Sequence, residues 1–233
     1  MNEQEKKYRH ELKYIISTPQ ISLLKSRIVP FMRPDPHVGE KGIYTIRSLY
    51  FDDYNNRCFY ENENGVDPRE KFRIRIYNHS SEHINLECKK KERGKTLKES
   101  ASLTKELAQQ LIDGASVRDI ESLPTLIRKM VIQENTLLLK PVIIVEYERI
   151  PYIYNNGNVR VTFDTNISSS SACETFWDSE LVKRPIMPVG MQLMEVKFDE
   201  YLPDFIYHAL NINTLRQTAF SKYYLCRKYS IHS

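Results

Sequence analysis

The fold is decided by the stretch from Arg69 to Lys91, which reads REKFRIRIYNHSSEHINLECKKK. Two runs of alternating charged and apolar residues flank a polar segment at 78–82, and this pattern predicts a hairpin of two strands. Successive strand side chains point to opposite faces, so each strand has one charged and one apolar face. The charged face holds Lys71, Arg73, Arg75, Tyr77, Glu87, Lys89 and Lys91. The apolar face holds Phe72, Ile74, Ile76, Ile84, Leu86 and Cys88.

The rest of the chain alternates groups of strands with inserted helices, which predicts an α+β fold with an antiparallel sheet. No linker divides the sequence, so we expect a single domain over residues 1–233. Further strands are expected at 8–16, 44–52, 95–101, 141–154, 159–166 and 186–198. Helices are expected at 18–31, 104–114, 117–133 and 203–211. Residues 168–171 are expected as a polar loop, 55–65 as a turn or helix, and 220–229 as a strand or helix.

Composition sets the broad class of the protein. Its net charge of +4 is too small to indicate a nucleic-acid partner by itself. There is no secretory signal pattern at the start, and the apolar runs are too short to span a bilayer. The scattered cysteines, which indicate neither zinc nor disulfides, are Cys58, Cys88, Cys173 and Cys226. We therefore expect a cytoplasmic protein with reduced thiols.

Common catalytic motifs are missing from the sequence. Gly94-Lys95-Thr96 has the ending of a Walker A motif, but Lys89 stands where the first glycine belongs, and no helix is expected to follow. The chain contains 7 glycines, so any phosphate binding must rely on side chains and not on a glycine-rich loop.

A Glu-x-Lys pattern recurs on three expected strands, at Glu11, Glu87 and Glu195. On one hairpin, charges facing solvent are the simpler interpretation. Repetition over many strands instead favours charged faces that share one interior. Each ion moved from water into such an interior costs on the order of several kcal/mol, so the cavity must be wet or filled by a polyanion. Phosphate chains suit it, because arginine binds phosphate with two hydrogen bonds and lysine supplies a point charge.

Seven segments together resemble the VTC-type polyphosphate polymerase domain of the triphosphate tunnel metalloenzyme superfamily. They are ELKY at 11–14, SLYFDD at 48–53, KFRIRIY at 71–77, LECKKK at 86–91, VRVTFDT at 159–165, MEVKF at 194–198 and FSKY at 220–223. The resemblance implies a closed antiparallel eight-stranded β-barrel tunnel with flanking helices. It also implies a phosphotransferase that moves the terminal phosphoryl group of ATP to a growing polyphosphate chain, with Mn²⁺ or Mg²⁺ as cofactor.

The resemblance also assigns roles to individual residues. Catalytic roles fall to Lys13, Arg73, Arg75, Lys89 and Lys222. Further phosphate binding falls to Lys98, Arg149, Arg160 and Lys197. The metal ligand is Glu195, with Glu87 as a possible second. Tyr147, Tyr152, Tyr154 and Trp177 are interpreted as core residues.

Two departures from related sequences bear on the activity. The CYTH branch of the superfamily carries E-x-E-x-K in its first strand, and Arg9 stands in place of the first glutamate here, which favours the polymerase branch. Ala219 stands where the family often has a basic residue, which keeps a polyphosphate-binding module without catalysis as an alternative. Hydrolysis of tripolyphosphate or a nucleoside triphosphate is a second alternative.

The expected partners are ATP and inorganic polyphosphate or triphosphate. Nucleic acid is not expected, because a duplex cannot enter the interior of an eight-stranded barrel. The chain has no membrane span of its own, so any coupling to a membrane would need a membrane-protein partner.

Overall fold

A computed structural model of the protein describes residues 8–210 and 215–231. It is built on an antiparallel sheet with the strand order β1-β10-β8-β7-β3-β4-β5-β6. These strands are β1 (His10–Ser17), β3 (Tyr44–Asp52), β4 (Arg69–Tyr77), β5 (Ser80–Glu92), β6 (Lys95–Leu103), β7 (Lys140–Tyr154), β8 (Val159–Ser170) and β10 (Met191–Phe198). Two short strands join its side: β2 (Arg33–Pro34) pairs with β7, and β9 (Arg184–Pro185) pairs with β8.

Six α-helices accompany the sheet in the described part of the chain. They are α1 (Thr18–Ile28), α2 (Arg57–Glu63), α3 (Lys105–Asp113), α4 (Thr125–Leu137), α5 (Asp204–Leu210) and α6 (Lys222–Ile231). Short 3₁₀ turns occur at Ile120–Ser122, Asn156–Asn158 and Cys173–Thr175.

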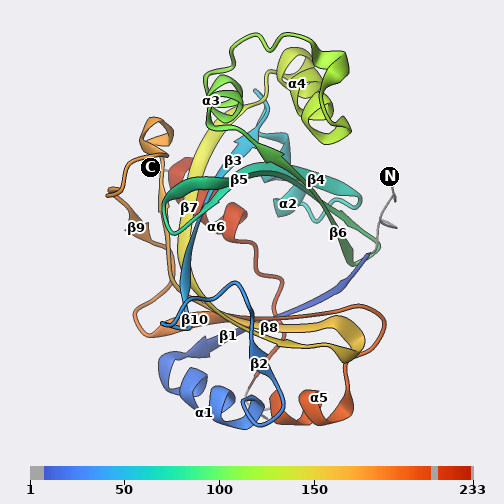
Figure 1. Ribbon diagram of the computed structural model, residues 1–233, viewed down its shortest axis with the longest axis vertical. Helices are drawn as coiled ribbons and strands as arrows, with labels where there is room; N and C mark the ends of the chain where they lie inside the picture. The colour runs from blue at the N-terminus through green and yellow to red at the C-terminus, as the bar shows by residue number, and fades with distance from the viewer. Residues whose placement is uncertain (1–7, 211–214, 232–233) are drawn as a thin grey trace.

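The sheet curls until its two edge strands meet (Figure 1). Next to the start of β1, the amide of Arg9 donates to the carbonyl of Thr96 at 2.9 Å, and the Thr96 amide donates back at 3.1 Å. Further along, the edge of β1 pairs with the C-terminal segment through a bridge between Tyr14 and Gln217. The expected α+β fold, an antiparallel eight-stranded barrel with flanking helices, is confirmed.

Helices cover the outer face of the sheet because its apolar side chains point outward. α3 and α4 lie over β4, β5 and β6 (Figure 1), where Phe72, Ile74 and Leu86 pack in one buried cluster with Leu111 and Met130. Full burial of such a side chain contributes roughly 1.5–3 kcal/mol. The other faces of these strands, which carry the charges, therefore point into the barrel.

A second layer covers the opposite side of the barrel. α1 and α5 lie side by side beneath β1, β8 and β10 (Figure 1), and Leu24 and Ile206 pack there with Phe163 and Met194. The helix over residues 18–31 was expected to be longer than α1, which ends at Ile28. These two layers lie outside the sheet, whereas α6 packs against part of its inner face, where Tyr223 and Cys226 join Tyr50 and Val145 in a buried cluster.

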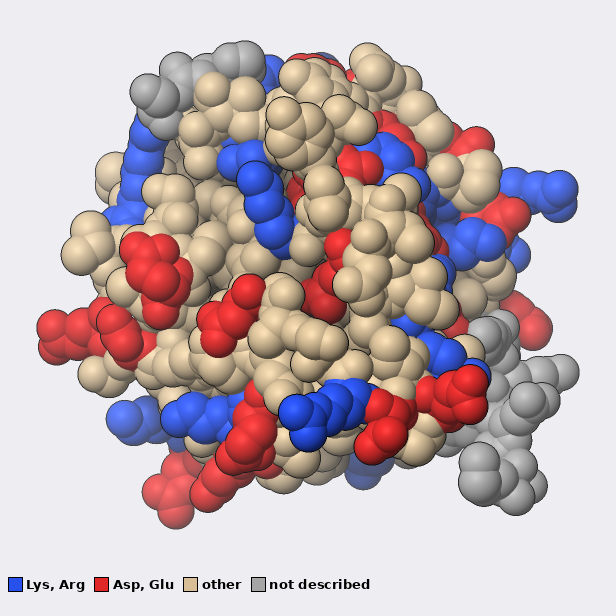
Figure 2. All heavy atoms as spheres, turned by 90° about the horizontal axis from the view of Figure 1, so that it is seen from above, with Lys and Arg blue, Asp and Glu red and all other residues tan. Residues whose placement is uncertain are grey.

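The outer surface carries both signs of charge. Figure 2 looks down on the side of α3 and α4 and shows Lys and Arg interspersed with Asp and Glu. Within the described residues, no helix combines the length and apolar character that crossing a bilayer requires.

The hairpin turn between β4 and β5 is shorter than expected. Asn78 and His79 both have positive φ, 50° and 57°, as a two-residue type I′ turn requires. Because this turn matches the twist of the strands, β5 begins at Ser80, within the expected polar segment at 78–82.

The helix expected at 117–133 is interrupted. Pro124 is extended, with ψ of 144°, and it separates the 3₁₀ turn at Ile120–Ser122 from α4. Proline lacks the amide hydrogen that a continuous helix needs, so the helix starts after it and runs on to Leu137.

The polar loop expected at 168–171 is wrong. Ser168, Ser169 and Ser170 continue β8 and are buried, because β7 pairs with them on one side and β9 on the other. Backbone pairing on both edges outweighs the weak strand preference of serine.

Three other expectations are resolved by the structure. Residues 220–229 form a helix, α6, and residues 55–65 contain α2. The strand expected at 186–198 begins only at Met191, whose amide closes a turn on the Pro188 carbonyl at 3.0 Å. The helix expected at 203–211 is α5, and position 211 lies outside the described residues.

Candidate functional site

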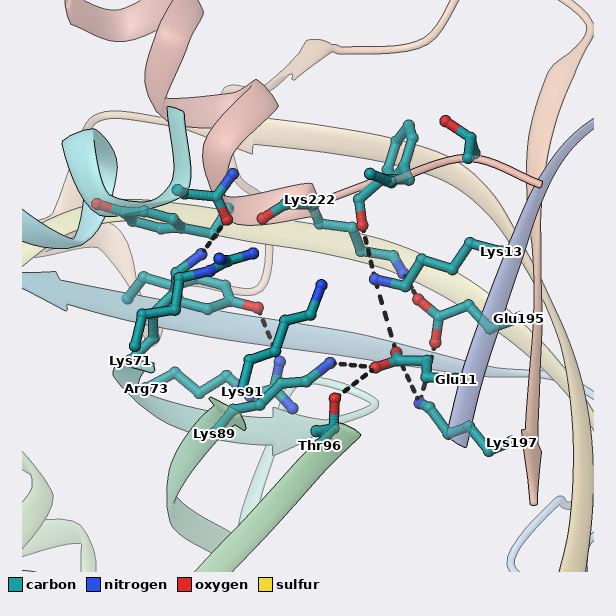
Figure 3. Close-up of a pocket in the computed structure, with 18 of the residues that line it drawn as sticks. Glu11, Lys13, Lys71, Arg73, Lys89, Lys91, Thr96, Glu195, Lys197 and Lys222 are labelled. Carbon is teal, nitrogen blue, oxygen red and sulfur yellow. Dashed lines mark hydrogen bonds and ion pairs between the residues drawn. The ribbon is translucent and has the colours of Figure 1, made fainter. Parts of the chain in front are cut away.

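The interior of the barrel is a cavity of about 710 Å³ with a strongly basic wall. Ten cations line it: Lys13, Arg69, Lys71, Arg73, Arg75, Lys89, Lys91, Arg149, Lys197 and Lys222. The carboxylates among its lining residues are Glu11, Asp67 and Glu195. Figure 3 labels several of them, and it shows Lys13, Lys89 and Lys197 pointing from different strands into one space. The wall thus encloses a surplus of positive charge.

Strand alternation brings these groups together. In β4 the side chains of Lys71, Arg73 and Arg75 line the cavity, while Phe72 and Ile74 between them are buried under the outer helices. The same alternation turns Lys13 of β1, Lys89 of β5, Arg149 of β7 and Lys197 of β10 into the cavity. Glu146 and Glu148 of β7 do not line it. On these strands, apolar side chains of one face therefore pack under the outer helices, and cations of the other face line the cavity.

Four buried residues form a compact ion network, which we call the buried cluster: Arg149, Asp164, Glu195 and Lys222. Arg149 lies opposite Asp164 in the β7–β8 pairing, and its Nε and Nη2 each donate to one Asp164 oxygen at 2.7 Å. The Lys222 amine lies 2.6 Å from Oδ2 of Asp164 and 2.8 Å from Oε1 of Glu195. Two cations and two carboxylates thus compensate one another.

The buried cluster stays ionised at neutral pH. Burial alone would raise the pKa of Asp164, but Arg149 and Lys222 lower it. Burial also opposes ionisation of Glu195, yet Lys197 and Lys222 hold its pKa well below the usual range. Burial would lower the pKa of Lys222, and Asp164 and Glu195 raise it instead. Each charge in this network therefore depends on its partners.

Glu87 compensates the two arginines of β4. Its side chain is 1% exposed and accepts from Nε of Arg73 at 2.7 Å, with Nη1 of Arg75 at 3.4 Å. The Lys98 amine lies 2.9 Å from its other oxygen. These contacts fix both guanidinium groups in the wall of the cavity.

Four half-buried cations form another part of the wall, which we call the rim cluster: Arg69, Lys71, Lys89 and Lys91. Lys71 donates to Oδ1 of Asn62 at 2.6 Å, a neutral partner. The Lys91 amine makes no interaction with the other residues drawn in Figure 3. The rim cluster thus has weaker internal compensation than the buried cluster.

Several rim and wall lysines share a single carboxylate, Glu11. The amines of Lys89, Lys13 and Lys197 lie 2.7, 3.6 and 3.7 Å from its oxygens. Burial lowers the pKa of Lys89 to about 7, and repulsion from Lys13 and Lys197 acts in the same direction. Burial and neighbouring cations likewise lower the pKa of Lys71 to about 7. Lys71 and Lys89 are therefore only partly protonated at pH 7.

Two tyrosines add hydroxyl groups to the wall. The Tyr50 hydroxyl accepts from Nη1 of Arg73 at 2.7 Å, and that of Tyr147 lies 3.4 Å from Nη2 of Arg75. Burial raises the pKa of Tyr147, but nearby cations, including Arg75 and Lys222, lower it overall. The interpretation of Tyr147 as a core residue is thus incomplete: it is buried, yet it also lines the cavity.

The family of the chain follows from comparison with known proteins. A family model described as the VTC domain matches residues 8–231. The chain belongs to the VTC domain family. Its sheet, curled around a basic interior, has the triphosphate tunnel fold that the sequence predicted.

The chain is similar to solved structures at low sequence identity. One is a putative adenylyl cyclase from Hippeastrum described with a dominant triphosphatase activity; it covers 95% of this chain and 96% of its own, with a TM-score of 0.54 and 12% identity. Another is a putative adenylate cyclase from Bacillus halodurans, with a TM-score of 0.48 and 16% identity. The match covers 87% of this chain and 86% of the Bacillus chain. No curated protein matches the chain.

The VTC domain brings most of the predicted site residues into one cavity. The predicted catalytic residues all line it: Lys13, Arg73, Arg75, Lys89 and Lys222. Two predicted phosphate ligands, Arg149 and Lys197, also line it, whereas Lys98 and Arg160 do not. Lys98 is 51% exposed and binds Glu87. Arg160 is held 2.7 Å from Asp35 and 3.0 Å from the Tyr44 hydroxyl.

The predicted metal ligands differ in their fit to a divalent cation. Glu195 lines the cavity and Glu87 does not, which is the difference between them, because cations lie against both oxygens of each carboxylate. No group of three or more possible ligands occurs in the described residues. Glu11 is the better second carboxylate, because Lys197 lies within 4 Å of both Glu11 and Glu195. Two carboxylates suit a Mg²⁺ or Mn²⁺ ion whose remaining ligands are water and substrate oxygens.

Asp164 of the buried cluster and Glu11 of the cavity wall were assigned no role in the sequence. Asp164 shares the alternation of Arg160 and Thr162 along β8, which is the signal that could have placed it on the charged face. Glu11 precedes Lys13 by two residues in β1 and so shares its face. A search for acidic residues an even number of positions from the basic residues of the same strand would have found both, because such residues share a face.

The two departures noted in the sequence have clear positions. Arg9 forms an ion pair with Asp199 at 2.9 Å and is not a lining residue of the cavity. Ala219 lines the cavity and contributes no charge there. Neither position removes a cation from the buried or the rim cluster.

Proposed function

We propose that the protein is a metal-dependent polyphosphate polymerase that transfers the terminal phosphoryl group of ATP to a growing chain, acting as one domain over residues 1–233. The observation that carries this proposal is the single cavity in which ten cations face three carboxylates. A polyanion with many phosphates neutralises such a wall better than a single phosphate group does. The match to the VTC domain supports the same function.

The geometry supports a transfer in which the protein mainly positions two phosphate groups. The bond between the γ-phosphorus of ATP and its bridging oxygen breaks, and a terminal oxygen of the chain forms the new bond. ADP leaves, and the chain gains one unit. We assign Arg73, Arg75, Lys13 and Lys222 to hold the reacting phosphates, because fixed cations stabilise the charge that shifts to the leaving oxygen.

The remaining cations serve the chain beyond the reacting unit. Arg149, Lys197 and Lys89 line the same cavity and can each contact a further phosphate. Glu195 and Glu11 would hold a divalent cation, which when bound neutralises phosphate oxygens. Tyr50 and Tyr147 keep the arginines oriented through their hydroxyl groups. A cytoplasmic location and a membrane-protein partner belong to the same proposal.

The decisive test incubates the purified protein with ATP and Mn²⁺ and follows the products by ³¹P NMR and gel electrophoresis. We expect ADP and long phosphate chains, with no product after EDTA and recovery on adding Mn²⁺. Lys222→Gln should abolish chain formation. Lys228→Gln, an exposed lysine on the same helix, is the matched control and should leave it unchanged.

The other outcomes discriminate the alternatives. Inorganic phosphate without chains would make the protein a hydrolase of tripolyphosphate or nucleoside triphosphate, as the Hippeastrum neighbour is described. Tight polyphosphate binding by calorimetry without turnover would make it a binding module. Absence of any binding would overturn the proposal.

A further inference from the structure

The first residues of α6 deliver two side chains to the cavity. α6 lies at the end of the barrel interior and is reached by the segment that pairs with β1 (Figure 1). Lys222, its first residue, belongs to the buried cluster, and Tyr223 follows it in the wall. The position of the Lys222 amine therefore depends on how the start of α6 is held.

Asp52 is one residue that holds it, from the side of β3. This aspartate ends β3 within the SLYFDD segment and is fully buried. Its Oδ1 accepts from the amides of Asp53 at 2.9 Å and Cys58 at 2.8 Å, and its Oδ2 accepts from Phe59 at 3.2 Å. The hydroxyl of Tyr223 donates a short hydrogen bond to Oδ2. Three backbone donors thus fix the carboxylate that receives Tyr223.

Tyr223 is also constrained from the cavity side. Its ring lies 5.2 Å from that of Tyr50, and the Lys71 amine lies 4.8 Å above it. These contacts involve the ring, whereas the hydroxyl bonds only to Asp52 among the described residues. The hydroxyl can therefore be removed while the ring stays in place.

We propose that Asp52 is a positioning residue, which through Tyr223 fixes the start of α6 and with it the Lys222 amine between Asp164 and Glu195. The inference rests on the proposed function, because it takes Lys222 as a phosphate ligand. A phosphate entering the cavity competes with Asp164 and Glu195 for the Lys222 amine. At that stage the backbone anchor, and not the ion pairs, keeps the amine in place, and small displacements of binding groups are costly.

The test uses Tyr223→Phe, which keeps the ring and leaves Asp52 its three backbone donors. We expect the Kd for tripolyphosphate, measured by calorimetry, to rise about tenfold, as for loss of a hydrogen bond to a charged group. The matched control is Tyr224→Phe on the same helix, whose hydroxyl binds Glu63 at 3.2 Å near the surface. That variant should bind tripolyphosphate like the wild type.

A double-mutant cycle separates positioning from a general structural effect. In a Lys222→Gln background, Tyr223→Phe should change the Kd no further. In a Lys89→Gln background, on a different strand, it should raise the Kd by the same factor as in the wild type. If Lys222→Gln does not fold, the same cycle is measured with Lys222→Arg. In that background Tyr223→Phe should raise the Kd for tripolyphosphate by a smaller factor than in the wild type.

The outcomes that overturn the inference are specific. An equal loss in the Lys222 and Lys89 backgrounds, or an equal loss from Tyr224→Phe, would show a structural role only. A wild type that binds tripolyphosphate but forms no chains would refute the polymerase and leave this cycle valid. A wild type that binds no tripolyphosphate would overturn both.

Discussion

The buried and rim clusters line one cavity but differ in how their charges are compensated. In the buried cluster, Lys222 lies within 2.8 Å of both Asp164 and Glu195, and Arg149 lies 2.7 Å from Asp164 and 3.4 Å from Glu195. In the rim cluster, Lys71 has a neutral amide as its hydrogen-bond partner, and Lys91 is drawn without one. The difference teaches that the two parts meet separate demands. The buried ions keep the barrel wall in place as well as lining the cavity, whereas Lys71 and Lys91 of the rim can bind a ligand without first breaking an ion pair.

The largest effect should come from breaking the buried cluster. Asp164→Asn leaves Arg149 and Lys222 buried with reduced compensation, and we expect a loss of about 3–5 kcal/mol in the free energy of unfolding. Urea denaturation measures it. Asp113→Asn, at an exposed helix position, is the control and should change stability by less than about 0.5 kcal/mol. Equal urea midpoints for both variants would contradict the structural role of the buried cluster.

Breaking the rim cluster should weaken binding and spare stability. Lys71→Gln and Lys91→Gln should each raise the Kd for tripolyphosphate about tenfold at low salt, because each removes one cation near the ligand. The urea midpoint should stay the same or rise, since Arg69 and Lys13 repel Lys91. Lys95→Gln, an exposed lysine that does not line the cavity, is the control for affinity. A loss of stability without a change in Kd would reverse the comparison.

The smallest effect, and the one that sharpens the comparison, is a dependence on pH. Lys71 and Lys89 have a pKa of about 7 in the free protein, and a bound anion raises it. Below pH 7 both lysines are already charged. Above pH 7 they must take up protons on binding, so affinity should fall as pH rises from 7 to 9. Calorimetry in two buffers with different ionisation heats measures this uptake.

The control for this dependence is the double variant Lys71→Gln with Lys89→Gln. In this variant the affinity for tripolyphosphate should fall less between pH 7 and pH 9 than in the wild type. The fall that remains should come only from the titration of tripolyphosphate itself. The buried cluster should contribute no proton uptake, because its groups are ionised throughout this range. Proton uptake that persists in the double variant would assign it to other groups.

Local sequence pattern was enough to assign the faces of the strands. Alternation placed Lys71, Arg73 and Arg75 together on one side of β4, and the structure has them so. The sequence pattern also predicted that a helix starts after Ser17. The Ser17 amide donates to the Gln20 side chain at 2.7 Å at this start. Such features depend on residues near in sequence, which is why they can be read from it.

Contacts across the barrel were beyond the reach of the pattern. Asp164 meets Arg149 through the register of β7 with β8, and Lys222 arrives from a helix 27 positions after Glu195. The alternation of side chains along a strand shows which face a residue is on. It does not show which residue of the next strand lies opposite, nor where a distant helix packs. The buried serines at the end of β8 show the same limit, because pairing with β9 decided their structure.

The wall of the barrel is unequal in strength along its circumference. β1 pairs with β10 at eight positions in register, but within the described residues its backbone pairing toward β6 is limited to the bridge of the preceding Arg9 with Thr96, beside a side-chain hydrogen bond from Thr96 to Glu11 at 3.3 Å. Local opening requires least free energy where fewest hydrogen bonds break, so breathing of the wall is expected along this line. A cavity that opens along its side presents its whole length at once, which suits a ligand that is itself a long chain.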